Sequence, residues 1–306
     1  MKVSVVGAGN VGSMLAARIL EKDLADVVLV DIIGNLAQAK ALDLKHSASI
    51  LGFQSTCVGT DDYNLIGDSN VVVITAGLAR KPGMSRDDLL KKNLSIVKEV
   101  SLKVKKFAPE AIVVVVTNPL DVMTYVVLKT TGFKRKKVIG MAGILDCARF
   151  SANIAEKFNL PVRSIECLII GMHSDAMIPI LSHTRASQTN IKHIASPEQL
   201  KEVMDKTKGA GKEIISLLGS GSAYFAPSAG AFFIVESILK NLKRTLVASV
   251  YLQGEYDIND VCLGVPVKIG AEGISQIIEV RLSREEKKAL KESASSLKQK
   301  FSEFSF

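Results

Sequence analysis

The chain has 306 residues, of which 47% are hydrophobic and 23% charged, and its formal net charge is +8. This composition predicts an ordinary globular protein of about two domains, and no apolar run approaches the ~20 residues of a membrane span. The basic balance favours anionic partners, but only 5% of the residues are aromatic and there is no Trp to stack on bases. The basic balance alone does not choose among nucleic acid, a membrane and small acids, but without stacking aromatics or a membrane span we expect neither nucleic acid nor a membrane as a partner.

The cysteines and the first residues predict the compartment. The four cysteines, Cys57, Cys147, Cys167 and Cys262, include no pair at metal-ligand spacing. We therefore expect reduced thiols, with neither a disulfide framework nor a metal site. The strand pattern begins at Lys2 and leaves no room for a signal peptide, which favours a cytoplasmic location.

The first strand leads directly into a glycine-rich turn. The apolar run Lys2–Val6 is followed by Gly7-Ala8-Gly9-Asn10-Val11-Gly12 and then by a helical pattern. In this context Gly7 permits the tight turn, Gly9 lets the backbone approach a pyrophosphate, and Gly12 lets the helix pack on the strand. The sequence therefore predicts a dinucleotide site at the N-terminus of this helix.

The second strand, at residues 27–30, ends in a carboxylate. Asp31 follows it, near the spacing from the glycine turn that is expected for the acid that binds the ribose hydroxyls. A carboxylate at this place repels a 2′-phosphate, so the sequence favours NAD over NADP. The alternative is that Asp31 is a helix cap or a surface acid.

Strands and helices continue to alternate to about residue 142. This order predicts a Rossmann-type, doubly wound parallel α/β sheet over residues 1–142. The expected helices are 36–50 and 87–106, and the expected strands are 55–58, 71–74, 112–116 and 138–139.

A basic loop follows the strand at 71–74. Within residues 78–88, Arg80 and Arg86 flank Pro82-Gly83, at the carboxyl end of a strand, where open α/β sheets bind ligands. Such a loop is typical of a hinged lid that brings guanidinium groups onto an anionic ligand and excludes water. The alternative is a solvated basic loop.

A polar sequence also follows the strand at 112–116. Val116 leads into Thr117-Asn118-Pro119, and an Asn at the carboxyl end of a strand can hydrogen-bond the substrate and the nicotinamide side of a site. The alternative for Asn118 is a helix cap before the proline. Asn93, on the helix at 87–106, can face the cofactor.

Residues 143–306 change in character and predict an α+β substrate domain. Strand-like runs at 245–252, 264–269 and 273–280, separated by turn residues, predict antiparallel hairpins. A further strand is expected at 165–170. The expected helices are 144–158, 197–218, 227–240 and 283–301, with a break at residues 219–222 and with Ser283 as the cap of the last helix.

Of the four histidines, only His173 comes just after an apolar strand. Reduction of a ketone needs a hydride at carbon and a proton at oxygen, and histidine is the side chain best matched to proton transfer near neutral pH. Asp146 and Arg149 are placed on one face of the helix at 144–158. A buried carboxylate such as Asp146 would fix the tautomer of His173 and stabilise the imidazolium. The alternative is a structural histidine.

Taken together, these motifs are highly specific. In chain order they are Gly7-Ala8-Gly9-Asn10-Val11-Gly12, Asp31, Ala79-Arg80-Lys81-Pro82-Gly83-Met84-Ser85-Arg86, Thr117-Asn118-Pro119, Leu145-Asp146-x-x-Arg149-Phe150 and Gly171-Met172-His173. Through essentially its whole length the chain resembles the lactate/malate dehydrogenase family, and in particular its lactate dehydrogenase-like malate dehydrogenases.

The resemblance implies NAD-dependent interconversion of (S)-malate and oxaloacetate. His173 is implied to give and take the proton at the C2 oxygen, with Asp146 as its partner. Arg149 is implied to clamp the C1 carboxylate through two parallel hydrogen bonds. Arg86 is implied to close over the site and polarise the reacting carbonyl, and Asn118 to bind substrate.

Further implications concern the cofactor and the choice of substrate. The segment 116–118 is implied to bind the cofactor, and the bond before Pro119 to be a cis peptide. Lactate dehydrogenases commonly carry glutamine at the position of Arg80, whereas an arginine supplies a counter-charge for the second carboxylate of malate or oxaloacetate. Ser174 replaces the glycine that usually follows the histidine, so we expect a small shift of this loop or one additional hydrogen bond.

Two other functions stay open. The first is a lactate dehydrogenase or a relaxed 2-hydroxyacid dehydrogenase, against which Arg80 argues. The second is a non-catalytic NAD-binding protein, which has no need to keep His173, Asp146, Arg149 and Arg86 together. Relatives form dimers or tetramers, so the resemblance implies a homodimer or a homotetramer without choosing between them.

Overall fold

The computed structural model describes residues 1–78 and 86–301. The centre of this part of the chain is a nine-stranded sheet in the order β14-β13-β12-β6-β5-β4-β1-β2-β3. The strands of the first half are β1 (Lys2–Val6), β2 (Asp26–Val30), β3 (Cys57–Thr60), β4 (Val71–Ile74), β5 (Ile112–Val115) and β6 (Val138–Gly140). They pair in parallel throughout, which confirms the predicted doubly wound sheet.

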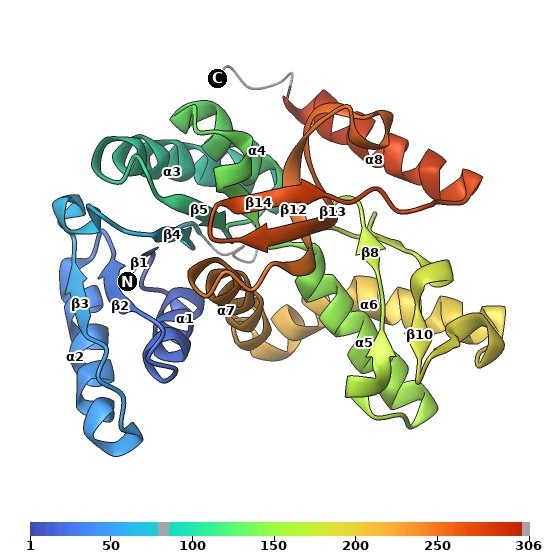
Figure 1. Ribbon diagram of the computed structural model, residues 1–306, viewed down its shortest axis with the longest axis horizontal. Coiled ribbons are helices and arrows are strands. Elements are labelled where there is room, and N and C mark those ends of the chain that lie inside the picture. The colour runs from blue at the N-terminus through green and yellow to red at the C-terminus, as the bar shows by residue number, and fades with distance from the viewer. Residues whose placement is uncertain (79–85, 302–306) are drawn as a thin grey trace.

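Helices cover both faces of this parallel half. They are α1 (Asn10–Leu20), α2 (Gly34–Leu51), α3 (Arg86–Phe107) and α4 (Leu120–Thr131). In Figure 1, α3 and α4 lie together on one side of the sheet, and α1 lies on the other side beside α7 (Phe225–Leu239), which comes from the second half of the chain. Every residue of β4 and of β5 is buried, as is expected of parallel strands that are covered on both faces.

The predicted antiparallel hairpins are present and continue the same sheet. They consist of β12 (Arg244–Gln253), β13 (Asn259–Gly270) and β14 (Gly273–Ile277). β12 also pairs antiparallel with β6, where Ser249 lies opposite Gly140. The sheet therefore crosses the expected boundary between residues 142 and 143, which itself falls between β6 and α5.

Three further helices belong to the second half. They are α5 (Gly143–Phe158), α6 (Pro197–Leu218) and α8 (Arg284–Phe301). α6 begins in a capping box, in which Ser196 Oγ accepts from Gln199 N at 3.3 Å and Gln199 Oε1 accepts from Ser196 N at 2.9 Å. Ser283 caps α8 as predicted, because its Oγ accepts a hydrogen bond from Glu286 N at 3.2 Å.

The prediction of a single strand at 165–170 is wrong, because the structure has two short strands there. β7 (Ile165–Glu166) pairs with β10 (Arg185–Ala186), while β8 (Ile169–Ile170) pairs with β9 (Ile178–Pro179). β10 also pairs with β11 (Thr189–Asn190). The apolar run indicates extended backbone, but it does not predict that its two ends take partners in different sheets.

The core has two parts. The larger extends through the nine-stranded sheet and the helices on both of its faces, and the smaller is built around Phe150 and Ile154 of α5. α5 thus carries apolar side chains into the smaller core while its first turns remain beside the sheet. No helix within residues 1–78 and 86–301 is long and apolar enough to cross a membrane.

Candidate active site

The turn after β1 is shaped by its glycines. Gly7 has φ +111°, and a Cβ there would lie 2.7 Å from Ala76 N. A Cβ on Gly12 would collide with the carbonyl oxygen of Gly7, whereas a Cβ on Gly9 would have no atom within 4 Å. Gly7 and Gly12 are therefore required by the turn itself, and Gly9 leaves open space beside the start of α1.

That open space fits a dinucleotide. Gly9 is the N-cap of α1 and no side chain caps the helix, so the first N–H groups and the positive end of the helix dipole face the open space. At the end of β2, Asp31 Oδ2 accepts from Ala8 N at 2.7 Å and Oδ1 accepts from Ile33 N at 3.0 Å. The carboxylate is thus fixed to the glycine turn. This is the position at which the sequence predicts a contact with the ribose hydroxyls of the cofactor.

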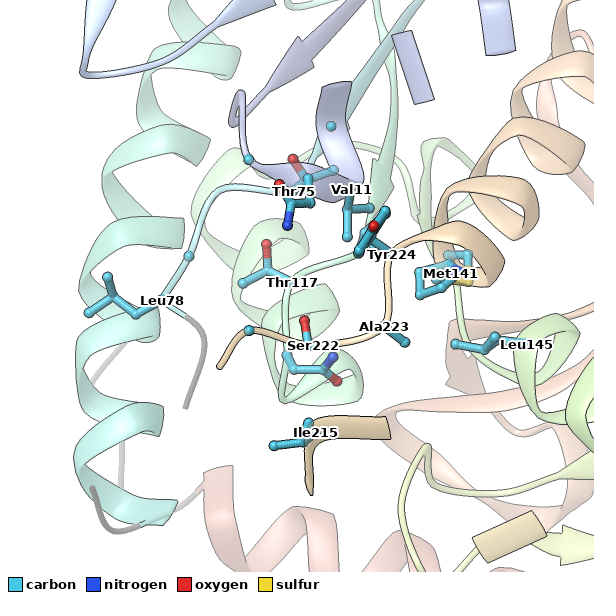
Figure 2. Close-up of a pocket in the computed structure, with 18 of the residues that line it drawn as sticks. Val11, Thr75, Leu78, Thr117, Met141, Leu145, Ile215, Ser222, Ala223 and Tyr224 are labelled. Atoms are coloured by element: carbon cyan, nitrogen blue, oxygen red, sulfur yellow. The ribbon is translucent and has the colours of Figure 1, made fainter. Parts of the chain in front are cut away.

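A cavity of about 480 Å³ begins at this turn. Figure 2 shows Val11 and Thr75 at one end, Ile215 at the other, and Ser222 and Ala223 between them. Its other lining residues include the ends of three parallel strands and the first turn of α5; they are Gly9, Asn10, Gly12, Gly77, Leu78, Leu89, Val116, Thr117, Asn118, Met141, Leu145, His173, Gly221, Tyr224 and Pro227. The cavity therefore lies at the carboxyl ends of the strands, the usual place for a ligand in such sheets.

Asn93 has a different place from the one expected. Its side chain is buried, Oδ1 accepts from Leu78 N at 2.7 Å, and Nδ2 donates to Asn118 O at 2.8 Å. It does not line the cavity. The amide instead ties the loops after β4 and β5 together, and Thr117 assists because its Oγ1 donates to Ala76 O at 2.7 Å.

A second cavity of about 320 Å³ adjoins the first. Asn118 and His173 line both of them. Asp146, Arg149 and Lys208 line only the second. His173 therefore lies where a long, mostly apolar cleft meets a smaller and more highly charged one.

The expected pair of His173 and Asp146 is formed. Nδ1 of His173 lies 2.8 Å from Oδ2 of Asp146, and the carboxylate is buried. Burial alone would favour the neutral ring, but the facing carboxylate outweighs it, so the pKa of His173 is raised. Because Nδ1 faces Asp146, the free nitrogen for proton exchange is Nε2, which has no hydrogen bond within the described residues.

Arg149 lies one turn after Asp146 on α5. It is half-buried and adjoins Gly211 of α6. Burial lowers its pKa, which the charge of Asp146 partly offsets. In the part of the chain that the structure describes, its guanidinium has neither a hydrogen bond nor a salt bridge, so it is available to an anion in the second cavity.

The two arginines of the basic loop are only partly covered by the structure. Arg80 lies outside the described residues. Arg86 is the first residue of α3, so it begins a helix.

The expected cis peptide bond between Asn118 and Pro119 is present. The additional hydrogen bond expected of Ser174 is also present, because its Oγ accepts from Ala176 N at 3.1 Å.

Some residues at the site were not predicted. The Gly-Ser pattern between α6 and α7 predicts only a helix break, yet Ser222 and the adjoining Ala223 line both cavities. Lys212, which lines the second cavity, pairs with Asp175 two residues after the histidine. In the sequence, the glycine-rich interruption at 219–222 between two predicted helices is the signal that could have indicated a ligand-facing loop.

No group of three potential metal ligands is found among the described His, Cys, Asp and Glu residues. All four cysteines, as expected, are free thiols. The polar groups that the structure brings together at the site are the histidine, the carboxylate and the arginine, beside the cavity that begins at the glycine turn.

Comparisons with known proteins agree with this geometry. Residues 1–140 match the family described as lactate/malate dehydrogenase, NAD binding domain, and residues 144–305 match its alpha/beta C-terminal domain. A curated malate dehydrogenase of Methanosarcina barkeri is 42% identical over 302 residues, which are 99% of this chain and 98% of that protein.

Two solved structures illustrate the structural similarity. The malate dehydrogenase of Cryptosporidium parvum has a TM-score of 0.96 at 38% identity and covers 99% of both chains. The lactate dehydrogenase of the same organism, solved with lactic acid and NAD, has a TM-score of 0.94 at 37% identity and covers 97% of this chain and 96% of its own. By its sequence and its structure, the chain belongs to the lactate/malate dehydrogenase family.

Proposed function

We propose that the chain catalyses the reversible, NAD-dependent oxidation of (S)-malate to oxaloacetate. The observation that carries the proposal is the buried pair of His173 and Asp146 at the junction of the two cavities, with the guanidinium of Arg149, which lines the second cavity, beside it. One cavity suits a dinucleotide and the other a small anion, and the proton-transfer group lies between them.

The first cavity, from Gly9 at the start of α1 to Asn118 after β5, would hold NAD, and the nicotinamide would supply or accept the hydride at the C2 carbon of the substrate. In the direction of reduction, the Nε2 proton of His173 goes to the C2 oxygen, and the ring becomes neutral as the hydroxyl forms. Asp146 stabilises the charged ring before this step and fixes Nδ1 as the nitrogen that keeps its proton.

Arg149 and Asn118 hold the substrate in this account. A planar guanidinium can bind the C1 carboxylate through two parallel hydrogen bonds, which orients the carbonyl toward Nε2 of His173. The amide of Asn118 adjoins both cavities and can contact both substrate and nicotinamide. Arg86 is proposed to reach the carbonyl from the start of α3.

Arg80 is proposed to choose the substrate. Oxaloacetate has a second carboxylate that pyruvate lacks, and burying it without a counter-charge is costly. The fold itself does not decide, since both a malate and a lactate dehydrogenase are similar to this chain. The full-length curated relatives named malate dehydrogenase support the dicarboxylate, and so does the arginine.

The proposal includes an assembly, a location and a division of the chain. Exposed apolar side chains at the end of α2, with Ile50 83% and Leu51 57% exposed, support a homodimer or homotetramer, which light scattering would measure. The four free thiols support the cytoplasm. The two family matches, over 1–140 and 144–305, support a cofactor domain at 1–142 and a substrate domain at 143–306.

The substrate assignment is tested with Arg80→Gln. Loss of a charge-assisted contact of about 1.5–3 kcal/mol should lower the ratio of oxaloacetate to pyruvate activity by about 10- to 100-fold. The measurement is kcat/KM for NADH oxidation with each 2-oxo acid. Lys81→Gln removes a charge from the same loop and should leave the ratio unchanged; an equal fall in both variants, or none in Arg80→Gln, would contradict the role of Arg80.

A further inference from the structure

A second buried carboxylate adjoins the histidine turn. Asp121, in the first turn of α4, is only 2% exposed. It lines neither cavity. A carboxylate that is buried but does not face a ligand needs partners within the protein to offset its desolvation.

Asp121 has two partners, one on each oxygen. Oδ2 accepts from the main-chain N–H of His173 at 2.8 Å, and Oδ1 accepts from Ser249 Oγ at 2.6 Å. The first partner is the residue that carries the proton in the proposed reaction, and it is held by its backbone. The ring of the same residue is held separately by Asp146.

The three partners come from separate parts of the fold. Asp121 belongs to the cofactor half, Ser249 lies on β12, and His173 follows β8. Ser249 is itself buried and lies opposite Gly140 of β6, so its hydroxyl is fixed by the central sheet. Asp121 therefore joins the histidine turn to β12 of the nine-stranded sheet.

The residue before the histidine is tied as well. Met172 N donates to Ser293 Oγ of α8 at 3.1 Å. Two successive N–H groups of the turn are thus bound by side chains from two different helices, α8 and α4. The ring of His173 has its Nδ1 on Asp146, and His173 lines both cavities.

The charges around the turn are consistent with this arrangement. Burial raises the pKa of Asp121, and the hydrogen bonds from Ser249 and His173 act in the opposite direction. Asp146 and Arg149 of α5 and Asp121 of α4 are the charged groups that face the histidine. Both carboxylates favour its protonated form, and the arginine opposes it.

We propose that Asp121 is a positioning residue for the acid–base histidine. It binds the main-chain N–H of His173 and, braced by Ser249, holds the ring in line between Asp146 and the substrate cavity. This inference deepens the proposed dehydrogenase function and rests on it. A contribution to folding alone is the competing explanation, and it predicts a different set of kinetic changes.

Three variants separate the two explanations. Asp121→Ala removes both hydrogen bonds. Asp121→Asn keeps an oxygen that can accept from His173 N and an amide that can donate to Ser249 Oγ. Ser249→Ala removes only the brace. Ser237→Ala is the matched control, because Ser237 is also fully buried and donates to Ile269 O at 2.8 Å, away from both cavities.

The readout is the single-turnover rate of oxaloacetate reduction per NADH-binding site, together with the KM for oxaloacetate and the NADH affinity. Because a small misplacement of a reacting group costs up to about 100-fold in rate, we expect Asp121→Ala to lose about that much with NADH affinity unchanged. Asp121→Asn should recover most of the rate. Ser249→Ala should lose several-fold and Ser237→Ala nothing.

Two results would overturn the positioning role. One is an Asp121→Ala enzyme with a lowered Tm and a normal rate per NADH-binding site. The other is an Asp121→Asn enzyme as slow as Asp121→Ala. If Asp121→Ala does not fold, the comparison of Ser249→Ala with Ser237→Ala decides, since equal rates in these two would contradict the proposal.

An NMR titration of the His173 ring separates this inference from the proposed function. It needs no turnover and uses the full chain without substrate. Ser249→Ala is the informative variant, because it removes the brace and leaves every charge near the ring in place. A lower ring pKa in Ser249→Ala, with Ser237→Ala unchanged, would support the positioning role even if the wild type reduced no 2-oxo acid. An unchanged titration in Ser249→Ala would contradict the role even in an active enzyme.

Discussion

The turn after β1 and the turn after β8 meet at the same cleft, but they are built differently. The first acts through its backbone: Gly7, Gly9 and Gly12 shape it, and its ligand-facing groups are N–H groups at the start of α1. The second presents one side chain, His173, whose ring and backbone are held by carboxylates from α5 and α4. The first is suited to binding a cofactor, and the second to moving a proton.

This difference predicts that damage to the two turns is separable. Changes at the β1 turn should weaken NADH binding and leave the chemical step intact. Changes around the histidine should slow the chemical step and leave NADH binding intact. The following variants test that separation.

The largest effect is expected from His173→Gln. Removing a general acid typically costs about 10²- to 10⁴-fold, and we expect about 10³-fold in the single-turnover rate of oxaloacetate reduction. NADH affinity, measured by fluorescence, should stay within about twofold, because the cofactor contacts lie on the other turn. The matched control is His183→Gln, at an exposed histidine. If His183→Gln loses as much rate as His173→Gln, His173 is not the general acid.

A smaller effect is expected from Arg149→Lys. Lysine keeps the charge but lacks the planar pair of donors, so the C1 carboxylate loses its orientation. We expect kcat/KM for oxaloacetate to fall by about 100-fold, which corresponds to about 2.7 kcal/mol. Arg163→Lys, at an exposed arginine of the same half, should change nothing. Unaltered kinetics in Arg149→Lys would mean that another group binds the carboxylate.

The smallest effect is expected at the other turn, from Gly9→Ala. A methyl group has room there in the free protein, so Tm should be unchanged. It would occupy the space assigned to the pyrophosphate and weaken NADH binding by about tenfold, about 1.4 kcal/mol. Gly209→Ala, which also has open space, is the control. Normal NADH affinity in Gly9→Ala would place the pyrophosphate elsewhere.

The two turns also differ in how well the sequence predicts them. The β1 turn is local, since its glycines, strand and helix are contiguous, and their spacing alone indicates the contacts. The histidine turn depends on partners that are distant in the chain: Asp146 is 27 residues away and Asp121 is 52. The motif that contains Asp146 predicts its role, whereas the sequence around Asp121 indicates only an ordinary acid in the first turn of a helix.

Other differences have the same cause. The position of Asn93 in the sequence is compatible with a ligand contact. Only the structure shows that its side-chain amide is hydrogen-bonded to the main chain of Leu78 and Asn118. Ser249 and Asp121 are 128 residues apart, and they meet because β12 joins the sheet of the other half. Sheet pairing across the two halves cannot be derived from the periodicity of either half.

The central claim is that Asp146 holds His173 in its protonated form at the junction of the cavities. The most direct test is the pH dependence of single-turnover oxaloacetate reduction in the wild type and in Asp146→Asn. Because the carboxylate raises the pKa of His173, the wild-type rate should stay constant to a higher pH and then fall about tenfold per pH unit as the ring loses its proton. In Asp146→Asn the fall should begin at a lower pH, because the carboxylate that raises the pKa of the ring is gone. Superimposable profiles would contradict the account.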